Sequence, residues 1–430
     1  MPTPRASLHE AMRFLIRGST AFQPYTTRDA FWDSRENIDA LLKIHEALSV
    51  TQYLPPRELR ELQRSRLKSL FARLPDAQYY AGDPLDTLRQ FPIHTHSVSA
   101  ELRLRNDADH GIMYEYLMDK DGRISSFAFD ANELMASLFG YVFRPFPIHA
   151  ETVRAMMERG FFLGVNVAGS RFLLSESPIH NDFYRHRTKD EALDELSLMA
   201  ERRKPSILCT YLPLVLEISD GRTFAPGTFA GCITSRETCS SNKIAEIEER
   251  LGCPLRRFYL RRDIGFIGWE CASTRGTYHL NEERIIAEVL DDAGNPVSSG
   301  AYGNIVLTAL DYQQIPILRR ATGDRGRFLE SRCPCGRSLR SLEIPDTDTM
   351  IRLAAGDVSL PLIQNSILSE GRIAKLRRCA ITQAGDNAIR VTLVPASAFS
   401  DVEIMAMRLA IYQVLPDHGI EVEIRFEGAS

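Results

Sequence analysis

Four residues in the second half of the chain restrict most strongly what this sequence can fold into. They are Cys271, His279, Cys333 and Cys335. Two thiolates one residue apart, a distant cysteine and a histidine are the ligand types of a closed tetrahedral zinc site. Two strand-like runs, Ile285–Leu290 and Asn304–Thr308, separate the two ligand pairs, and the hairpin they predict would bring the pairs together. The alternative is a set of unrelated reduced side chains, but thiols one residue apart rarely serve packing alone. The pattern therefore favours a structural zinc site.

The composition excludes several function classes for these 430 residues. Hydrophobic residues make up 44% and charged residues 25%, as in ordinary globular proteins. The net charge of −4 gives no electrostatic reason for a nucleic-acid or membrane-surface partner. No apolar run approaches the roughly 20 residues of a membrane helix, and the N-terminus lacks the apolar core of a signal peptide. The eight cysteines fit a reducing compartment better than a disulfide framework, so we expect a cytoplasmic protein.

Alternating helical and strand-like segments predict an α/β core. Apolar residues at helical spacing predict helices over Ala30–Val50, Pro56–Leu74, His149–Phe162, Lys189–Arg202, Leu212–Ser219 and Ser240–Leu251. Buried strands are expected at Gly164–Val167, Pro205–Tyr211 and Ala230–Ser235. The last 78 residues (353–430) predict a compact α+β unit. Its elements are a helix at Leu362–Ser369, strands at Cys379–Gln383 and Ala388–Pro395, a helix at Asp401–Val414 and a strand at Glu421–Phe426.

Several of these segments together carry a family resemblance. They are Phe258–Glu270, Ala301–Leu310, Ile315–Arg319, Ala321–Asp324 and Cys333–Arg337. Over about residues 60–430 the chain resembles the phenylacetate–CoA ligase branch of the adenylate-forming superfamily. The resemblance implies an α/β fold, in which a large N-terminal domain of β-sheets and flanking helices precedes a small α+β C-terminal lid domain. We expect an N-terminal helical segment at 1–60, the large domain at 61–348 and the lid at 349–430. The family also places a structural zinc on the four Cys and His residues named above.

The same resemblance assigns three candidate nucleotide-binding residues. Asp324 falls where the family has an aspartate that binds the ribose, although a plain Thr-Gly-Asp turn explains this residue equally well. Tyr259 and Asp263 fall on the family's Tyr-Gly-x-Thr-Glu motif, whose glycine leaves room for adenine and whose glutamate binds magnesium. In this chain Leu260 replaces the glycine, and Asp263 is a shortened substitute for the glutamate.

Other ATP-handling features of the family are altered as well. The phosphate loop falls on Tyr116–Ser125, where Asp119 and Asp121 would repel a triphosphate; a tight Asp-Gly hairpin between two strands is the favoured alternative. At the hinge, Pro345-Asp346 replaces the family's Gly-Arg, and no lysine follows Lys375. Because adenylation depends on phosphate positioning and electrostatic stabilisation, these changes argue against the use of ATP and magnesium.

Three functions remain open at this point. The first is an enzyme that handles a small aryl or acyl carboxylic acid as its CoA or carrier-protein thioester, by ATP-independent acyl transfer in a biosynthetic pathway. The second is an active ATP-dependent acyl- or aryl-CoA ligase, and the third is a scaffold or regulator without catalysis. The expected partners are an acyl-CoA (or another pantetheine thioester) or an acyl carrier protein, and a homodimer is left open. No catalytic residue is assigned, because Cys209, Cys232 and Cys239, the candidate nucleophiles, lie in or near apolar runs that are typical of structural cysteines.

Overall fold

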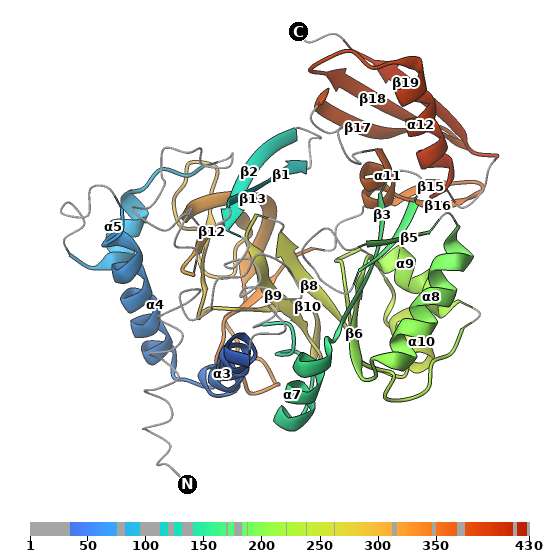
Figure 1. Ribbon diagram of the computed structural model, residues 1–430. Helices are drawn as coiled ribbons and strands as arrows, with labels where there is room; N and C mark the ends of the chain where they lie inside the picture. Colours follow the sequence, from blue (N-terminus) through green and yellow to red (C-terminus); the bar gives the residue numbers. More distant parts are fainter. Residues whose placement is uncertain are drawn as a thin grey trace. The chain divides into compact units, whose positions relative to one another are not determined.

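Figure 1 shows the computed structural model of the chain. The structure describes residues 35–74, 82–94, 112–118, 124–130, 141–168, 171–175, 183–186, 188–220, 222–237, 239–261, 263–311, 316–345, 350–367, 375–415 and 419–427. The chain divides into two compact units, which are described separately. Unit 1 comprises residues 1–115, 127–160 and 256–345, and unit 2 comprises residues 116–126, 161–255 and 346–430.

Unit 1 is built on consecutive antiparallel strands. They are β8 (Leu255–Arg261), β9 (Gly265–Cys271), β10 (Thr274–Leu280), β11 (Ile285–Leu290), β12 (Gly303–Ala309), β13 (Ile317–Phe328) and β14 (Ser341–Glu343). Their spatial order is β11-β12-β13-β14-β10-β9-β8, so the short strand β14 is inserted between β13 and β10. Strands from both ends of this order supply side chains to one apolar core, for example Tyr259 from β8 and Val289 from β11. These strands therefore share one core.

The described helices of unit 1 are α3 (Arg35–Thr51), α4 (Pro56–Phe71), α5 (Pro84–Gln90) and α7 (Ala150–Arg159), and α4 and α5 pack against the sheet. Helix α4 begins with a proline in its first turn, where the missing N–H costs nothing. Its apolar face, including Leu67 and Leu70, packs against Ile286 of β11 and Leu318 of β13. Amphipathic packing thus fixes α4 against one end of the sheet.

A buried ion pair fastens these helices to the turn between β10 and β11. Arg144 donates two hydrogen bonds to the Glu283 carboxylate, at 2.7 and 2.6 Å, and both side chains are almost fully buried. Thr51 at the end of α3 donates to the same carboxylate at 2.6 Å. Arg66 of α4 donates to the Glu283 carbonyl oxygen at 2.7 Å. Every described oxygen of Glu283 therefore has a donor, as a buried charge requires.

Unit 2 contains a mixed sheet with the order β7-β6-β3-β4-β5. Its strands are β3 (Phe162–Ala168), β4 (Arg171–Ser175), β5 (Phe183–His186), β6 (Ser206–Thr210) and β7 (Phe229–Thr234). The first three in spatial order run parallel, and β4 and β5 continue antiparallel. Helices α8 (Lys189–Arg202), α9 (Leu212–Ser219) and α10 (Ser241–Leu251) share one apolar core with the sheet. Thr188 and Glu191 form a capping box at the start of α8.

The C-terminal part of unit 2 has its own core. The hairpin of β15 (Met350–Leu353) and β16 (Gly356–Ser359) leads into α11 (Leu360–Ile367). The three-stranded sheet of β17 (Leu376–Gly385), β18 (Ala388–Pro395) and β19 (Glu421–Phe426) carries α12 (Asp401–Tyr412). Their apolar residues form a single cluster.

The predicted α/β fold class is confirmed, and several predicted boundaries are met within a residue or two. The helix predicted over His149–Phe162 is wrong at its end, because Gly160 adopts a φ of 73° that stops α7, and Phe162 then begins β3. Strands β1 (Ile112–Met118) and β2 (Ile124–Asp130) pair with each other on both sides of the predicted Asp-Gly hairpin. The loop with Asp119 and Asp121 lies outside the described residues, as does Asp346 of the hinge. The three-part division at 60 and 348 stays a prediction. No helix in the described ranges is long and apolar enough to cross a membrane.

Candidate metal centre and nucleotide-site residues

The four predicted metal ligands lie together in unit 1. One donor atom from each of Cys271, His279, Cys333 and Cys335 lies within 4.8 Å of all the others. The Sγ atoms of Cys271 and Cys333 are 3.4 Å apart, and Cys335 Sγ is 3.1 Å from His279 Nε2. A tetrahedron with metal–sulfur bonds of about 2.3 Å has sulfur atoms about 3.8 Å apart. The donor set therefore has the size and the chemistry that a single zinc ion requires.

Strand pairing explains how ligands from two distant segments meet. Cys271 ends β9 and His279 lies on β10, and these strands form an antiparallel hairpin. Cys333 and Cys335 lie in the loop between β13 and β14, and β14 pairs with β10 so that Ser341 is opposite His279. The strand β14, and not the β11–β12 hairpin expected from the sequence, thus brings the two halves together. That hairpin does form, but β11 lies at the far end of the strand order.

A glycine makes this close packing feasible. A Cβ atom on Gly268 of β9 would lie 2.5 Å from the carbonyl oxygen of His279, which is closer than real Cβ contacts allow. The backbones of β9 and β10 therefore approach each other beside a predicted metal ligand, and only glycine fits there.

The surroundings keep the His279 ring neutral and oriented. Burial and the nearby Arg337 guanidinium lower the pKa of His279 to about 4. Ser341 Oγ lies 3.4 Å from Nδ1, which leaves Nε2 directed at Cys335. Burial also raises the pKa of Cys271 to about 11, so a thiolate there needs a cation to compensate its charge. A neutral imidazole and thiols that ionise on metal binding are the usual state of a Cys3His site.

The nucleotide-site candidates lie on β8, β13 and the turn after β8. Tyr259 Oη donates to Asp324 Oδ2 at 2.9 Å, and Asp324 N donates to Thr322 Oγ1 at 3.0 Å. The predicted Thr-Gly-Asp segment is part of the long strand β13, with Gly323 at a φ of 81°. The structure thus brings Tyr259 and Asp324 together, and Asp324 is half-buried.

Asp263 has a different environment from that of a magnesium ligand. Arg261 donates to both of its carboxylate oxygens, at 3.0 and 3.2 Å, and Arg320 Nε lies 3.4 Å from Oδ2. Arg261 also donates to the Thr322 carbonyl oxygen at 2.7 Å, which links this cluster to the strand that carries Asp324. Asp263 and Arg320 are buried, so two guanidinium groups neutralise one carboxylate inside the protein. Leu260, between Tyr259 and Arg261, is instead 40% exposed.

Ser235 and Glu237 of unit 2 form a polar pair that the sequence analysis missed. They follow β7 at the carboxyl ends of the parallel strands β3, β6 and β7. Ser235 Oγ donates to Glu237 Oε2 and accepts from the first N–H of α9, that of Leu212, at 3.1 Å. Burial raises the pKa of Glu237, and Ser235 partly opposes that rise. The signal was available: a Ser and a Glu directly after a buried parallel strand lie where open α/β sheets bind ligands.

Of the three candidate nucleophiles, Cys232 is buried, and Cys209 and Cys239 are partly buried. Burial raises the pKa of Cys209 to about 12 and raises that of Cys232 well above its usual range. Cys239 packs against the core of unit 2. Because the thiolate is the reactive form, these raised pKa values disfavour nucleophilic attack by Cys209 and Cys232.

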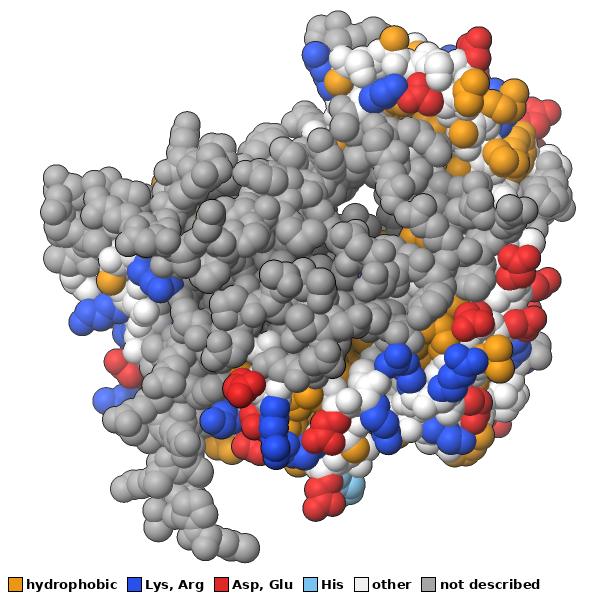
Figure 2. Space-filling view, viewed as in Figure 1, with side chains coloured by type: hydrophobic (Ala, Val, Ile, Leu, Met, Phe, Trp, Pro, Cys, Tyr) orange, Lys and Arg blue, Asp and Glu red, His pale blue; other side chains and the backbone are white. Residues whose placement is uncertain are grey.

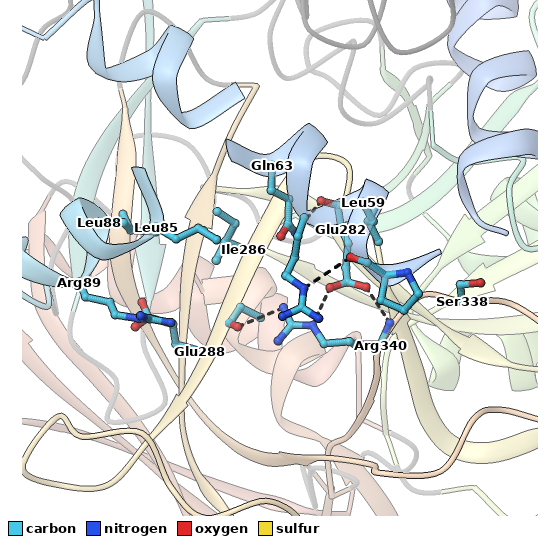
Figure 3. A pocket seen from close by; sticks show the side chains of 13 residues that line it. Leu59, Gln63, Leu85, Leu88, Arg89, Glu282, Ile286, Glu288, Ser338 and Arg340 are labelled. Carbon is cyan, nitrogen blue, oxygen red and sulfur yellow. Dashed lines mark hydrogen bonds and ion pairs between the residues drawn. The ribbon is translucent and has the colours of Figure 1, made fainter. Parts of the chain in front are cut away.

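A pocket of about 390 Å³ lies in unit 1 between α4, α5 and β11 (Figure 3). Its apolar lining consists of Pro56, Leu59, Leu85, Leu88, Ile286 and Ala287. Both of its carboxylates are engaged: Glu282 accepts from Arg340 at 2.6 Å, and Glu288 accepts from Arg319 at 3.0 Å. None of the predicted site residues lines this pocket. The pocket therefore does not unite the metal centre with the nucleotide-site candidates.

The fold can be compared with those of solved structures. A solved 2-hydroxyisobutyryl-CoA ligase, in complex with 2-HIB-AMP and CoA, matches 88% of this chain and 88% of its own chain with a TM-score of 0.53 and 14% identity. The chain thus has the fold of that solved CoA ligase, which confirms the predicted fold.

Sequence comparison then connects the chain with one branch of that class. It is 34% identical over 96 residues to a phenylacetate-coenzyme A ligase of Thermus thermophilus, and the predicted resemblance to that branch is confirmed. The matched segment spans 22% of this chain and 22% of that relative. No protein-family model matches the chain.

Proposed function

We propose that this protein binds a small aryl or acyl group as its CoA or carrier-protein thioester and transfers it without forming an acyl adenylate. The observation that carries the proposal is the environment of Asp263. A magnesium ligand must offer a carboxylate oxygen to the ion. Both oxygens of Asp263 are engaged by Arg261, and Arg320 adds a second positive charge. A divalent cation at this position would meet two guanidinium groups at close range.

The carboxyl ends of β3, β6 and β7 are the proposed position of the acyl group. Parallel strands of open α/β sheets place ligands at this edge. Ser235, Glu237 and the start of α9 supply polar groups there, and Thr234 has a buried hydroxyl without a hydrogen-bond partner among the described residues. Burial raises the pKa of Glu237, which favours its protonated form more than in an exposed glutamate.

The transfer step follows from the state of the cysteines. Because burial raises the pKa of Cys209 and Cys232, a covalent acyl-enzyme on either is disfavoured. The nucleophilic atom of the acceptor would then attack the thioester carbonyl carbon directly. The C–S bond breaks, and the departing thiol takes up the proton that the acceptor loses. No ATP is consumed in such a step.

Zinc is the proposed occupant of the Cys271, His279, Cys333 and Cys335 site, in a structural role. The site has four protein donors, which leaves no open position for a substrate. The ion would hold the loop between β13 and β14 against β10.

An ATP-dependent acyl- or aryl-CoA ligase is the second candidate. The pair of Tyr259 and Asp324 favours it, because a half-buried carboxylate beside a tyrosine is able to bind the two hydroxyls of a ribose. In this case the ion pairs of Asp263 would have to open when nucleotide and magnesium bind.

Acid-dependent exchange of labelled pyrophosphate into ATP separates the two candidates. We expect no exchange with a panel of aryl and short-chain acids, whereas acyl-CoA thioesters of the same acids should raise the melting temperature by binding the folded state. Exchange that Asp324→Ala abolishes would establish the ligase instead. A scaffold would show neither exchange nor stabilisation by any thioester.

A further inference from the structure

Helix α12 presents an apolar stripe to solvent. Val402, Met405 and Leu409 are 78%, 67% and 55% exposed, whereas Met407, Ala410 and Ile411 on the opposite face are fully buried. The spacing of three and four residues places the exposed side chains on one line along the helix. Figure 2 shows apolar side chains gathered at the surface of the C-terminal part of unit 2, at the upper right of the view. Large aliphatic side chains this exposed, in a row, mark an interaction surface.

Two opposite charges flank this stripe on the same side. Asp401 lies in the first turn and Arg408 lies seven positions further on, which is close to two helical turns. Both are exposed, and neither forms an ion pair with another described residue, whereas Glu403 on the same helix is engaged by Lys375 at 2.6 Å. The stripe is centred near Met405, so Asp401 and Arg408 lie at similar distances on either side of its centre.

We propose that the α12 stripe is the contact between two copies of this chain, whose α12 helices pair antiparallel about a two-fold axis near Met405. About a two-fold axis, if one residue of the first copy contacts a given residue of the second copy, the reverse contact also forms. The surface must therefore be complementary to itself. In this arrangement Val402 faces Leu409 of the second copy, and Met405 packs against its own counterpart. Asp401 faces Arg408 of the second copy, and this ion pair forms twice.

Charge complementarity selects a second copy over other occupants. In a parallel pair Asp401 would face Asp401, and Arg408 would face Arg408, so the same charges would repel. An acidic partner would repel Asp401, and a basic partner would repel Arg408. Three aliphatic side chains form a contact much smaller than the roughly 800 Å² per partner of a standard interface. We therefore expect a weak dimer that dissociates on dilution.

Sedimentation of the full chain over roughly 1 to 500 µM should show a reversible monomer–dimer equilibrium. Met405→Glu should weaken the association by about tenfold or more, because it places two carboxylates at the axis. Leu198→Glu, at a 52% exposed leucine on α8, is the matched control and should leave the equilibrium unchanged. Both sites are exposed, so neither variant should alter folding. A monomer at every concentration would overturn the proposal, as would equal effects of the two variants.

A charge exchange tests the antiparallel geometry. Asp401→Arg alone and Arg408→Asp alone should each weaken self-association, because each creates like-charged pairs across the axis. A mixture of these two variants should form heterodimers as strong as the original dimer, and the double variant should recover homodimers. If the mixture associates no better than either variant alone, antiparallel pairing through α12 is wrong, and the stripe then belongs to a different partner such as a carrier protein.

Discussion

His279 on β10 lies directly opposite Ser341 on β14, and the Ser341 hydroxyl is 3.4 Å from the imidazole Nδ1. This one pairing places the Cys333–Cys335 loop over Cys271 and His279, because β14 follows that loop directly in the chain. The three residues of β14 therefore connect the Cys333–Cys335 loop to the strand that carries His279. Their loss would separate the ligands even if all four remained.

Loss of a metal ligand should destabilise unit 1. Freshly purified protein should contain about one zinc per chain that survives dialysis, because four protein donors close the site. Cys333→Ser should remove the metal and lower the melting temperature by several degrees. Cys239→Ser, at a half-buried cysteine outside the site, is the matched control. Zinc-free native protein, or a Cys333→Ser variant as stable as the control, would contradict the assignment.

Removal of the Asp263 carboxylate should lower the stability of the folded protein rather than abolish a reaction. Asp263→Asn leaves Arg320 buried without its carboxylate, and breaking a buried pair costs about 3–5 kcal/mol. Urea unfolding measures the change, and Asp39→Asn, in an exposed pair with Arg154, should cost less than about 1 kcal/mol. If Asp263→Asn kept normal stability but abolished a magnesium-dependent reaction, Asp263 would be a metal ligand after all.

The Arg144–Glu283 pair should be among the most sensitive contacts of unit 1. Arg144→Ala leaves a buried carboxylate that keeps only the Thr51 hydroxyl as a side-chain donor, and we expect a loss of about 3–5 kcal/mol. Arg154→Ala removes an arginine from α7 whose pair with Asp39 is half-exposed, so its effect should stay below about 1 kcal/mol. Similar unfolding free energies for the two variants would show that burial does not decide the cost.

Glu237 should make stability depend on pH in a defined direction. Burial raises its pKa above the usual 4.5 in the folded state, so the folded protein binds this proton more tightly than the unfolded chain does. The contribution of Glu237 is therefore complete below pH 4.5 and is lost as pH rises through the folded pKa. Glu237→Gln cannot ionise, so its melting temperature relative to the natural protein should rise with pH across this window. A difference that stays constant with pH would show that Glu237 ionises normally.

The elements predicted best from the sequence are those that a local side-chain pattern decides. Helix α9 and strands β18 and β19 begin and end where their apolar periodicity and flanking polar residues indicated, because side-chain pattern decides such elements. The sequence also singled out Cys271, His279, Cys333 and Cys335, which the structure brings together, because their residue types alone restrict the chemistry. Zinc binding by these residues stays a prediction. The predicted roles of Tyr259, Asp263 and Asp324 in nucleotide binding stay predictions.

Contacts between distant parts of the chain could not be predicted from local sequence patterns. Strand β14 has three residues, too few for any periodicity, although it joins β10 to β13. The partners of Asp263 include Arg320, a residue far along the chain that nothing in the Tyr259–Asp263 motif indicates. Ser235 and Glu237 were overlooked because their importance comes from the end of a parallel sheet, which exists only after the strands have assembled.

If the proposed zinc site is correct, its ligands also impose an order on synthesis. Cys271 and Cys333 are 62 positions apart, and His279 and Cys335 are 56 positions apart. On the ribosome Cys271 and His279 emerge first, and the Cys271 thiol must remain reduced until the second pair leaves the exit tunnel. An ion captured at that moment would close a loop of about sixty residues and lower the entropy of every state in which unit 1 is still unfolded. Metal supply during translation, rather than afterwards, should therefore decide how much of the newly made chain reaches its native form.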